Sequence, residues 1–115
     1  VNKYDQEISS SAVNASFVRE INKIGPFGTS NPLPTFLIKN LKVIKTNILN
    51  DKHISVIFKP NSGRSIKSIC FNSLNTKSGY YLLSHKENMN VIGQIHENIW
   101  NNKKTIQLNI KDLIL

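Results

Sequence analysis

The chain has 115 residues, of which 39% are hydrophobic, and this allows one folded domain with a modest core. No apolar run reaches bilayer length, which argues against a membrane span, and no signal-peptide pattern opens the sequence. The net charge of +8 favours nucleic acid as a partner, although the 16 Asn, 16 Ile and 13 Lys also fit a bias towards A/T-rich codons.

The single cysteine indicates the redox compartment of the protein, and the first residue indicates whether the sequence is a fragment. Cys70 stands in the apolar run SICF, cannot form an internal disulfide, and has no Cys or His at zinc-ligand spacing. We therefore expect a buried, unreactive thiol in a reducing cytoplasm. Because the sequence starts with Val1 rather than Met, we also expect a fragment of a longer protein.

Residues 1–25 predict a strand remnant followed by a linker helix. Lys3–Ile8 is short and mixed, and Ser9–Ser11 offers oxygens that can cap a helix start. Gly25 and Pro26 follow in the order that ends helices. The apolar residues between these signals recur at helical spacing and predict an amphipathic helix of about four turns: Val13, Phe17, Ile21 and Ile24.

A stiff elbow over residues 26–36 connects this helix to a β domain. The stretch GPFGTSNPLPTF, Gly25–Phe36, holds three of the four prolines and two of the five glycines. Proline fixes φ and lacks an N–H donor, while glycine opens positive φ. We therefore expect neither a helix nor a strand ladder to run through the elbow.

From residue 37 to 115 the apolar period is two, which predicts a β domain. A phase slip near Asn40 and Leu41 indicates a bulge or a sharp bend in its first strand. Residues 73–87 break the rhythm and predict a loop with a short helix. The predicted strands are 36–48, 53–59, 64–72, 90–98 and 104–112, with turns at Asn50–Asp51, Pro60–Gly63 and Asn101–Asn102.

This order of elements predicts a mainly β, five-stranded OB-fold, the Greek-key barrel with a short helix between its third and fourth strands. Several other small barrels share the five-strand count, so the pattern alone leaves them open. The side chains expected on inner faces are Ile54, Val56, Phe58, Ile66, Cys70, Ile106, Leu108 and Ile110. Three aromatic residues are also assigned to the core: Phe71, Tyr80 and Tyr81.

The elbow and the last hairpin carry motifs by which the chain resembles the C-terminal OB domain of RecJ, the DHH-type bacterial exonuclease family specific for single-stranded DNA. The resemblance runs from about Asp5 to Asp112. Its elbow motif is Pro26, Phe27, Gly28, Asn31, Pro32, Pro34 and Phe36. The later matches are His53, the run Cys70, Phe71 and Asn72, and the hairpin residues Asn98, Trp100, Gln107, Leu108 and Asp112. Ser30 and Asn102 stand where the family has glycine, and Asn tolerates left-handed backbone, so we expect the hairpin to persist.

The resemblance implies a non-catalytic domain that binds single-stranded DNA within a RecJ-like 5′–3′ exonuclease used in DNA repair and recombination. In that family, upstream DHH-type domains hold the divalent metal, so the parent protein would use Mn²⁺ or Mg²⁺ and this chain would need no cofactor. The implied partners are single-stranded DNA, those catalytic domains and, further, single-strand-binding protein.

The residues themselves give no sign of an autonomous enzyme. The seven acidic residues are scattered without metal-ligand spacing. No glycine-rich phosphate loop, nucleophile elbow or Cys/His dyad is present in the sequence.

The expected DNA-binding residues follow from the way OB barrels bind oligonucleotides, across the second and third strands and between the first–second and fourth–fifth loops. A single strand needs cations for its phosphates and aromatic faces for its bases. Eight residues fall at those places: Lys52, His53, Lys59, Arg64, Lys67, Trp100, Lys103 and Lys104.

Each candidate also has a structural interpretation. Trp100 could close the barrel end, His53 could orient a loop by hydrogen bonding, and Arg64 could be simply solvated. The elbow residues Pro26, Phe27 and Pro34 are assigned to packing. The alternative function is therefore a structural or protein-interaction barrel that braces a nuclease core without touching DNA.

Overall fold

The protein is described here by a computed structural model that covers residues 4–14, 19, 33–61, 63–84 and 88–114. All five predicted barrel strands and the predicted short helix are present, and the last two strands are longer than expected. The elements are β1 (Gln6–Ile8), the 3₁₀ turn η1 (Ser10–Ala12), β2 (Phe36–Leu49), β3 (His53–Lys59), β4 (Ile66–Cys70), α2 (Lys77–Ser84), β5 (Met89–Trp100) and β6 (Lys103–Ile114).

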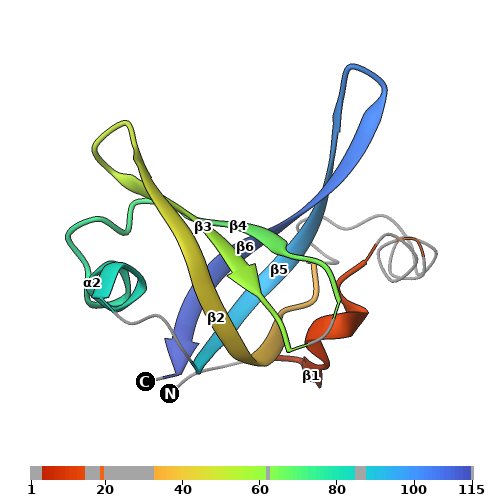
Figure 1. Ribbon diagram of the computed structural model, residues 1–115, viewed down its shortest axis with the longest axis horizontal. Coiled ribbons are helices and arrows are strands. Elements are labelled where there is room, and N and C mark those ends of the chain that lie inside the picture. Colours follow the sequence, from red (N-terminus) through yellow and green to blue (C-terminus); the bar gives the residue numbers. More distant parts are fainter. Residues whose placement is uncertain (1–3, 15–18, 20–32, 62, 85–87, 115) are drawn as a thin grey trace.

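The strands of the described residues form one sheet that closes into a barrel (Figure 1). The order is β1-β2-β3-β4-β6-β5, and an additional pairing between β2 and β5 closes the five long strands on themselves. β4 and β6 are parallel, whereas β2, β3 and β4 form an antiparallel meander and β5 and β6 a hairpin. This is the topology of an OB-fold, and the predicted fold class is confirmed.

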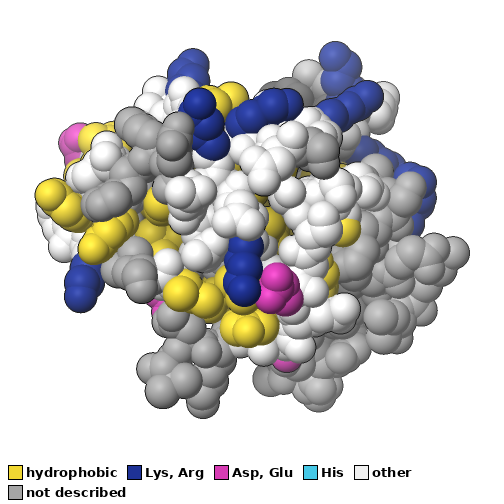
Figure 2. Space-filling model, turned by 60° about the horizontal axis from the view of Figure 1, so that its bottom comes forward, with side chains coloured by type: hydrophobic (Ala, Val, Ile, Leu, Met, Phe, Trp, Pro, Cys, Tyr) yellow, Lys and Arg dark blue, Asp and Glu magenta, His cyan; other side chains and the backbone are white. Residues whose placement is uncertain are grey.

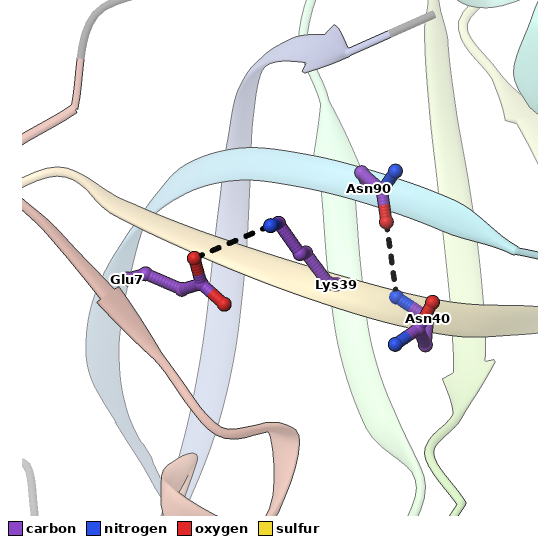
Figure 3. Close-up of polar contacts among 4 residues, drawn as sticks. All are labelled: Glu7, Lys39, Asn40 and Asn90. Atoms are coloured by element: carbon purple, nitrogen blue, oxygen red, sulfur yellow. Dashed lines mark hydrogen bonds and ion pairs between the residues drawn. The ribbon is translucent and has the colours of Figure 1, made fainter.

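β2 contributes to two different antiparallel ladders because it bends at Asn40. Its first half pairs with β5 and its second half with β3, and the register with β5 shifts between Ile38 and Leu41. Asn40 has a φ of 61°, and its backbone N–H donates to Asn90 Oδ1 at 3.1 Å (Figure 3). The predicted phase slip is therefore a real irregularity that turns the strand around the barrel.

β1 extends the sheet beside the first half of β2, to which it is parallel. An exposed ion pair joins Lys39 Nζ to Glu7 Oε1 across these two strands at 3.4 Å (Figure 3). Just before β2, the backbone N–H of Thr35 donates to Asp5 Oδ2 at 2.6 Å, and Asp5 N–H donates to Thr35 O at 2.7 Å. The end of the elbow is thus fastened to the strand that precedes it in the chain.

The two long hairpins turn through left-handed asparagine and aspartate residues. Asn50 and Asp51 have φ values of 52° and 55°, and Asn101 and Asn102 have 49° and 64°. Positive φ at both central residues is the type I′ arrangement, whose twist matches that of the flanking strands. The prediction that the last hairpin persists with Asn102 in place of the family's glycine is confirmed.

The core lies inside the barrel and includes nearly all the inner-face residues that the sequence predicts. Ile54, Val56, Phe58 and Leu108 are completely buried, and Ile106 packs against them while partly exposed. The core assignment was wrong for two aromatic residues, since Phe71 is 51% exposed and Tyr80 is 65% exposed. Phe71 directly follows the inward Cys70, the last residue of β4, and its side chain lies on the outside of the barrel. Tyr80 points away from the inward Gly79 and Leu82 of α2.

Most of the predicted N-terminal helix and most of the elbow lie outside the described residues, and Val13, where the helical spacing begins, has a non-helical backbone. Ser9 caps the short turn η1, where its Oγ accepts from Ser11 N–H at 3.3 Å, and Val13 beyond it packs partly against the core. The domain boundaries at residues 25 and 36 therefore stay predictions. Of the elbow residues, Pro34 is half-buried and Phe36 is buried in the core, and the packing role that we assigned to the elbow stays a prediction.

Candidate nucleic-acid interface

Two hairpin arms rise from the same side of the barrel and diverge (Figure 1). One arm is the β2–β3 hairpin, which turns at Asn50–Asp51, and the other is the β5–β6 hairpin, which turns at Asn101–Asn102. In an OB-fold these arms are the first–second and fourth–fifth loops that flank an oligonucleotide. The surface between them is the outer face of β3, β4 and β6.

The register of the strands fixes which side chains share this outer face. Lys45 of β2 pairs with Ile57 of β3, Ile57 with Lys67 of β4, and Lys67 with Gln107 of β6. Ile57 and Lys67 each stand between two buried neighbours, so the side chains of this row lie on the outside of the barrel. A mixed row of two lysines, a half-buried isoleucine and an amide thus crosses the sheet.

Beside this row, a cleft of about 520 Å³ brings together residues that are distant in the sequence. Three of the predicted cations line it: Arg64, Lys67 and Lys104. Among the described residues of the lining, the one acidic residue is Glu97. The hydroxyl-bearing residues of the lining are Ser10, Ser11, Ser65 and Thr105. Guanidinium, ammonium and hydroxyl donors are the groups that hold phosphate oxygens.

Positive charge is also prominent on the face of the molecule that Figure 2 presents. Figure 2 shows Lys and Arg side chains gathered towards the upper rim of the face that it presents, with acidic side chains sparse among the described residues. With an overall charge of +8, such a surface attracts polyanions at low ionic strength. The bias in codon usage therefore does not prevent the lysines from acting as a surface field.

The β2–β3 arm is tied to the loop that follows β4. His53 Nδ1 accepts from the backbone N–H of Asn72 at 2.9 Å, and the carbonyl oxygen of Lys52 accepts from Leu74 N–H at 3.1 Å. The loop-orienting interpretation of His53 is therefore what the structure displays, while the Lys52 side chain is exposed at the arm. Lys52 lies in the turn of this arm and His53 is the first residue of β3, and a contact of either with DNA stays a prediction.

Lys59 has a local role at the other end of β3. Its Nζ donates to the carbonyl oxygen of Gly63 at 2.9 Å and so spans the turn between β3 and β4. Gly63 has a φ of 96°, a conformation that side-chain-bearing residues rarely adopt. This hydrogen bond spans the loop in which Arg64, a residue of the cleft lining, directly follows Gly63.

The β5–β6 arm carries the remaining candidates. Lys103 pairs with Trp100 and Lys104 pairs with Ile99 across the hairpin, so the two lysines point to opposite faces. Lys104 faces the cleft, and Lys103 does not line it. The side chain of Trp100 lies outside the described part of the structure, so its stacking role stays a prediction.

Three residues of the hairpin motif, Asn98, Gln107 and Asp112, form side-chain hydrogen bonds within β5 and β6. Asn98 Nδ2 donates to Gln107 Oε1 at 3.3 Å, and Gln107 Nε2 donates to Asn109 Oδ1 at 2.9 Å. Asp112 Oδ1 accepts from the backbone N–H of Leu113 at 2.8 Å. The motif residues Pro26, Phe27, Gly28, Asn31 and Pro32 lie outside the described residues.

Two titratable side chains have shifted pKa values. Burial raises the pKa of the Cys70 thiol, against a smaller lowering by the hydrogen bond with Ser73. Burial, and secondly the nearby Lys111 ammonium, lower the pKa of His96. His96 Nε2 is buried and has no hydrogen-bond partner among the described residues. Both shifts disfavour the charged form, which is what desolvation does.

The described residues offer no group of three or more His, Cys, Asp or Glu side chains that could hold a metal ion. They also contain no helix long and apolar enough to cross a bilayer.

Sequence reasoning missed Phe71 as a surface residue. The signal was present, because the assignment of Ile66 and Cys70 to the inner face of β4 implies an outward Phe71 at period two. We gave more weight to the expectation that large apolar side chains are buried. That expectation is weak, because buried residues are mostly apolar but many apolar side chains also lie on the surface.

A basic, grooved OB barrel defines a class of oligonucleotide- and oligosaccharide-binding domains. Comparison with known proteins identifies the particular family: residues 4–112 match the family described as the RecJ OB domain. The match covers nearly the whole chain, and the chain belongs to this family.

Individual relatives agree with this assignment. The chain is 28% identical over 102 residues to the single-stranded-DNA-specific exonuclease RecJ of Bacillus subtilis, a match that covers 87% of this chain and 12% of that protein. The chain thus spans about an eighth of the length of this relative.

The fold recurs in crystal structures of RecJ from Thermus thermophilus. The structure in complex with Mg²⁺ has a TM-score of 0.58 at 22% identity, covering 84% of this chain and 14% of that one. The structure in complex with Mn²⁺ has a TM-score of 0.59 at 21% identity, covering 85% and 13%.

Proposed function

We propose that this chain is the domain that holds single-stranded DNA in a RecJ-like 5′–3′ exonuclease of DNA repair and recombination. The observation that carries the proposal is the convergence of Arg64, Lys67 and Lys104 on one cleft, at the edge of the outer face of β4. These cations come from a loop and two strands that only the closed barrel brings together.

In this proposal the cleft receives phosphates and the sheet face receives the rest of the strand. Lys67 belongs both to the lining of the cleft and to the row that continues across the sheet towards Lys45. Backbone contacts of this kind do not read sequence, so we expect binding to be indifferent to base order. Glu97 makes one part of the cleft negative, so in this proposal the phosphates bind beside the cations and away from Glu97.

The domain would assist catalysis carried out elsewhere. We infer that hydrolysis and the divalent metal belong to DHH-type catalytic domains of the longer protein, since the Thermus thermophilus RecJ structures contain Mg²⁺ or Mn²⁺ and the described residues here have no cluster for either ion. Those domains, and beyond them single-strand-binding protein, are the proposed protein partners. On this basis the isolated chain should leave DNA intact in a nuclease assay with added Mn²⁺.

The proposal is tested by titrating the chain into a fluorescent oligo-dT and following anisotropy at several salt concentrations. Binding should weaken steeply with salt, and the Arg64→Ala, Lys67→Ala, Lys104→Ala triple variant should reduce the slope of log K against log salt by about 2, since each phosphate contact on a single strand contributes about 0.7. Lys77→Ala on α2, an exposed lysine outside the cleft, is the matched control. Absence of binding even at low salt contradicts the proposal.

A structural role is the second candidate, favoured by exposed apolar side chains away from the cleft. Ile44 on β2 is 51% exposed, and Tyr80 on α2 is exposed as well. If the barrel only braces its neighbours, the triple variant should leave the DNA affinity of the longer enzyme unchanged while Tyr80→Asp loosens its domains. Measuring both variants in the longer enzyme separates the two roles.

A further inference from the structure

Phe71 is a large aromatic side chain that the fold leaves on the surface at the end of β4. Lys67 and Ile69 lie on the outer face of β4, which ends at Cys70, and the exposed Phe71 is the next residue of the chain, roughly 13 Å along from Lys67. The strand that borders the basic cleft at Lys67 is therefore followed directly by an exposed ring beside His53 of the β2–β3 arm.

The ring is held in place by a neighbour that is itself fixed. His53 and Phe71 form an edge-to-face pair with ring centroids 5.2 Å apart and an interplanar angle of 78°. The imidazole is fixed in turn by the hydrogen bond from Asn72 N–H to Nδ1. Because a side chain ordered in advance loses less entropy on binding, a ring held this way is suited to stacking.

The surroundings of the ring match the needs of a nucleobase. Leu49, which pairs with His53 across the arm, is 40% exposed and adds apolar surface. Asn47 pairs with Ser55, and Ser55 pairs with Ile69, so amide and hydroxyl groups stand in the adjacent row where base edges can hydrogen-bond. A protein partner would also accept an exposed phenylalanine, but the lysine on the same strand face favours a polyanion that carries flat rings.

We propose that Phe71, supported by His53 and Leu49, is a stacking platform for one nucleobase of the bound single strand. The inference rests on the proposed function. It adds a contact between the protein and a base of the bound strand to the proposed contacts with phosphates. The cations hold the backbone at the cleft, and the platform holds a base at the other end of β4. Every base has a π face, so the platform adds affinity without reading sequence.

The test compares an oligo-dT strand with a strand of equal length and charge in which the bases are absent. The wild-type chain should bind oligo-dT more tightly than the base-free strand. Phe71→Ala should weaken binding to oligo-dT by about 5- to 150-fold, should leave binding to the base-free strand unchanged, and should keep the salt slope. Phe71→Trp should retain or improve the affinity for oligo-dT, and Phe71→Leu should lose it despite remaining apolar.

Tyr80→Ala is the matched control, because it removes another exposed aromatic ring from α2 and should have no effect on either strand. Thermal unfolding of each variant verifies that the fold is intact. Because Phe71 is exposed, we expect its replacement to leave the fold stable. If the wild-type chain binds both strands equally and Phe71→Ala changes nothing, the platform is wrong while the proposed function stands. If the wild-type chain binds neither strand, both are overturned.

Discussion

Gly93 of β5 lies so close to Asn109 of β6 that a Cβ atom at Gly93 would be 2.6 Å from the carbonyl oxygen of Asn109. The contact sits at the register shift between Ile92 and Gly93, next to the pairing of Gly93 with Phe36 that closes the barrel. A backbone oxygen cannot rotate away as a side chain does. The glycine is therefore required by the close approach of the two strands.

We predict that Gly93→Ala destabilises the fold by about 3 kcal/mol, at the upper end of overpacking effects. Urea unfolding followed by circular dichroism measures this. Asn109→Ala is the control, because it trims the side chain but leaves the carbonyl in place, and it should cost about 1 kcal/mol for one lost hydrogen bond. A Gly93→Ala variant as stable as the wild type would contradict the close contact.

The β5–β6 arm should respond to its turn residues in a predictable direction. Asn102 has a φ of 64°, which glycine adopts freely and alanine does not. We expect Asn102→Ala to cost about 1 kcal/mol or slightly more, and Asn102→Gly to be neutral or stabilising. The midpoint of thermal unfolding ranks the three proteins, and an alanine variant more stable than the glycine variant would refute the type I′ assignment.

The stability of the domain should depend on pH through His96. Its pKa is lowered in the folded protein, mainly by burial and also by Lys111, so the unfolded chain takes up the proton first. Stability is then complete above the ordinary value of 6.5, falls as the pH decreases from 6.5 towards the lower pKa of the folded state, and changes no further below that.

Comparing urea unfolding at pH 7.5 and 5.5 for the wild type and His96→Gln isolates this contribution. The wild type should lose more stability between the two pH values than the variant does, because glutamine cannot be protonated. Equal losses would show that His96 is as easily protonated in the folded protein as in the unfolded one.

Cys70 should be protected from thiol reagents by the fold. It is buried, and burial raises the pKa of its thiol, so both access and the reactive thiolate are reduced. We expect labelling by an aromatic disulfide reagent to be roughly a thousand-fold slower in the folded protein than in urea, where the chain is open. Phe71→Ala should preserve the protection, since the barrel rather than that ring covers Cys70; rapid labelling of the native chain would contradict the assignment.

Most of the fold follows from local signals that survive in the structure. The strands were predictable because their apolar residues alternate, and the hairpin turns because Asn and Asp tolerate positive φ. Even the bend at Asn40 was visible as a slip in the alternation. The motifs of the elbow and the last hairpin then indicated the family that the comparisons identify.

The arrangement of the candidate site was less accessible from the sequence. The cleft depends on the parallel pairing of Lys67 with Gln107, a contact between distant segments that leaves no local pattern. Lys59, one of the predicted DNA-binding cations, instead donates a hydrogen bond to the carbonyl oxygen of Gly63 in the β3–β4 loop. Phe71 was misassigned because general hydrophobicity was given more weight than the period of its own strand.

The parallel pairing of β4 with β6 also sets an order of assembly. The β2–β3–β4 meander contains only neighbouring strands and can form as soon as residue 70 is available, whereas the ladders that close the barrel need β5 and β6. During synthesis the open edge of β4 must therefore wait for Lys103–Ile114 to emerge from the ribosome. A chain interrupted before that point would display an unpaired apolar strand, a template for intermolecular association.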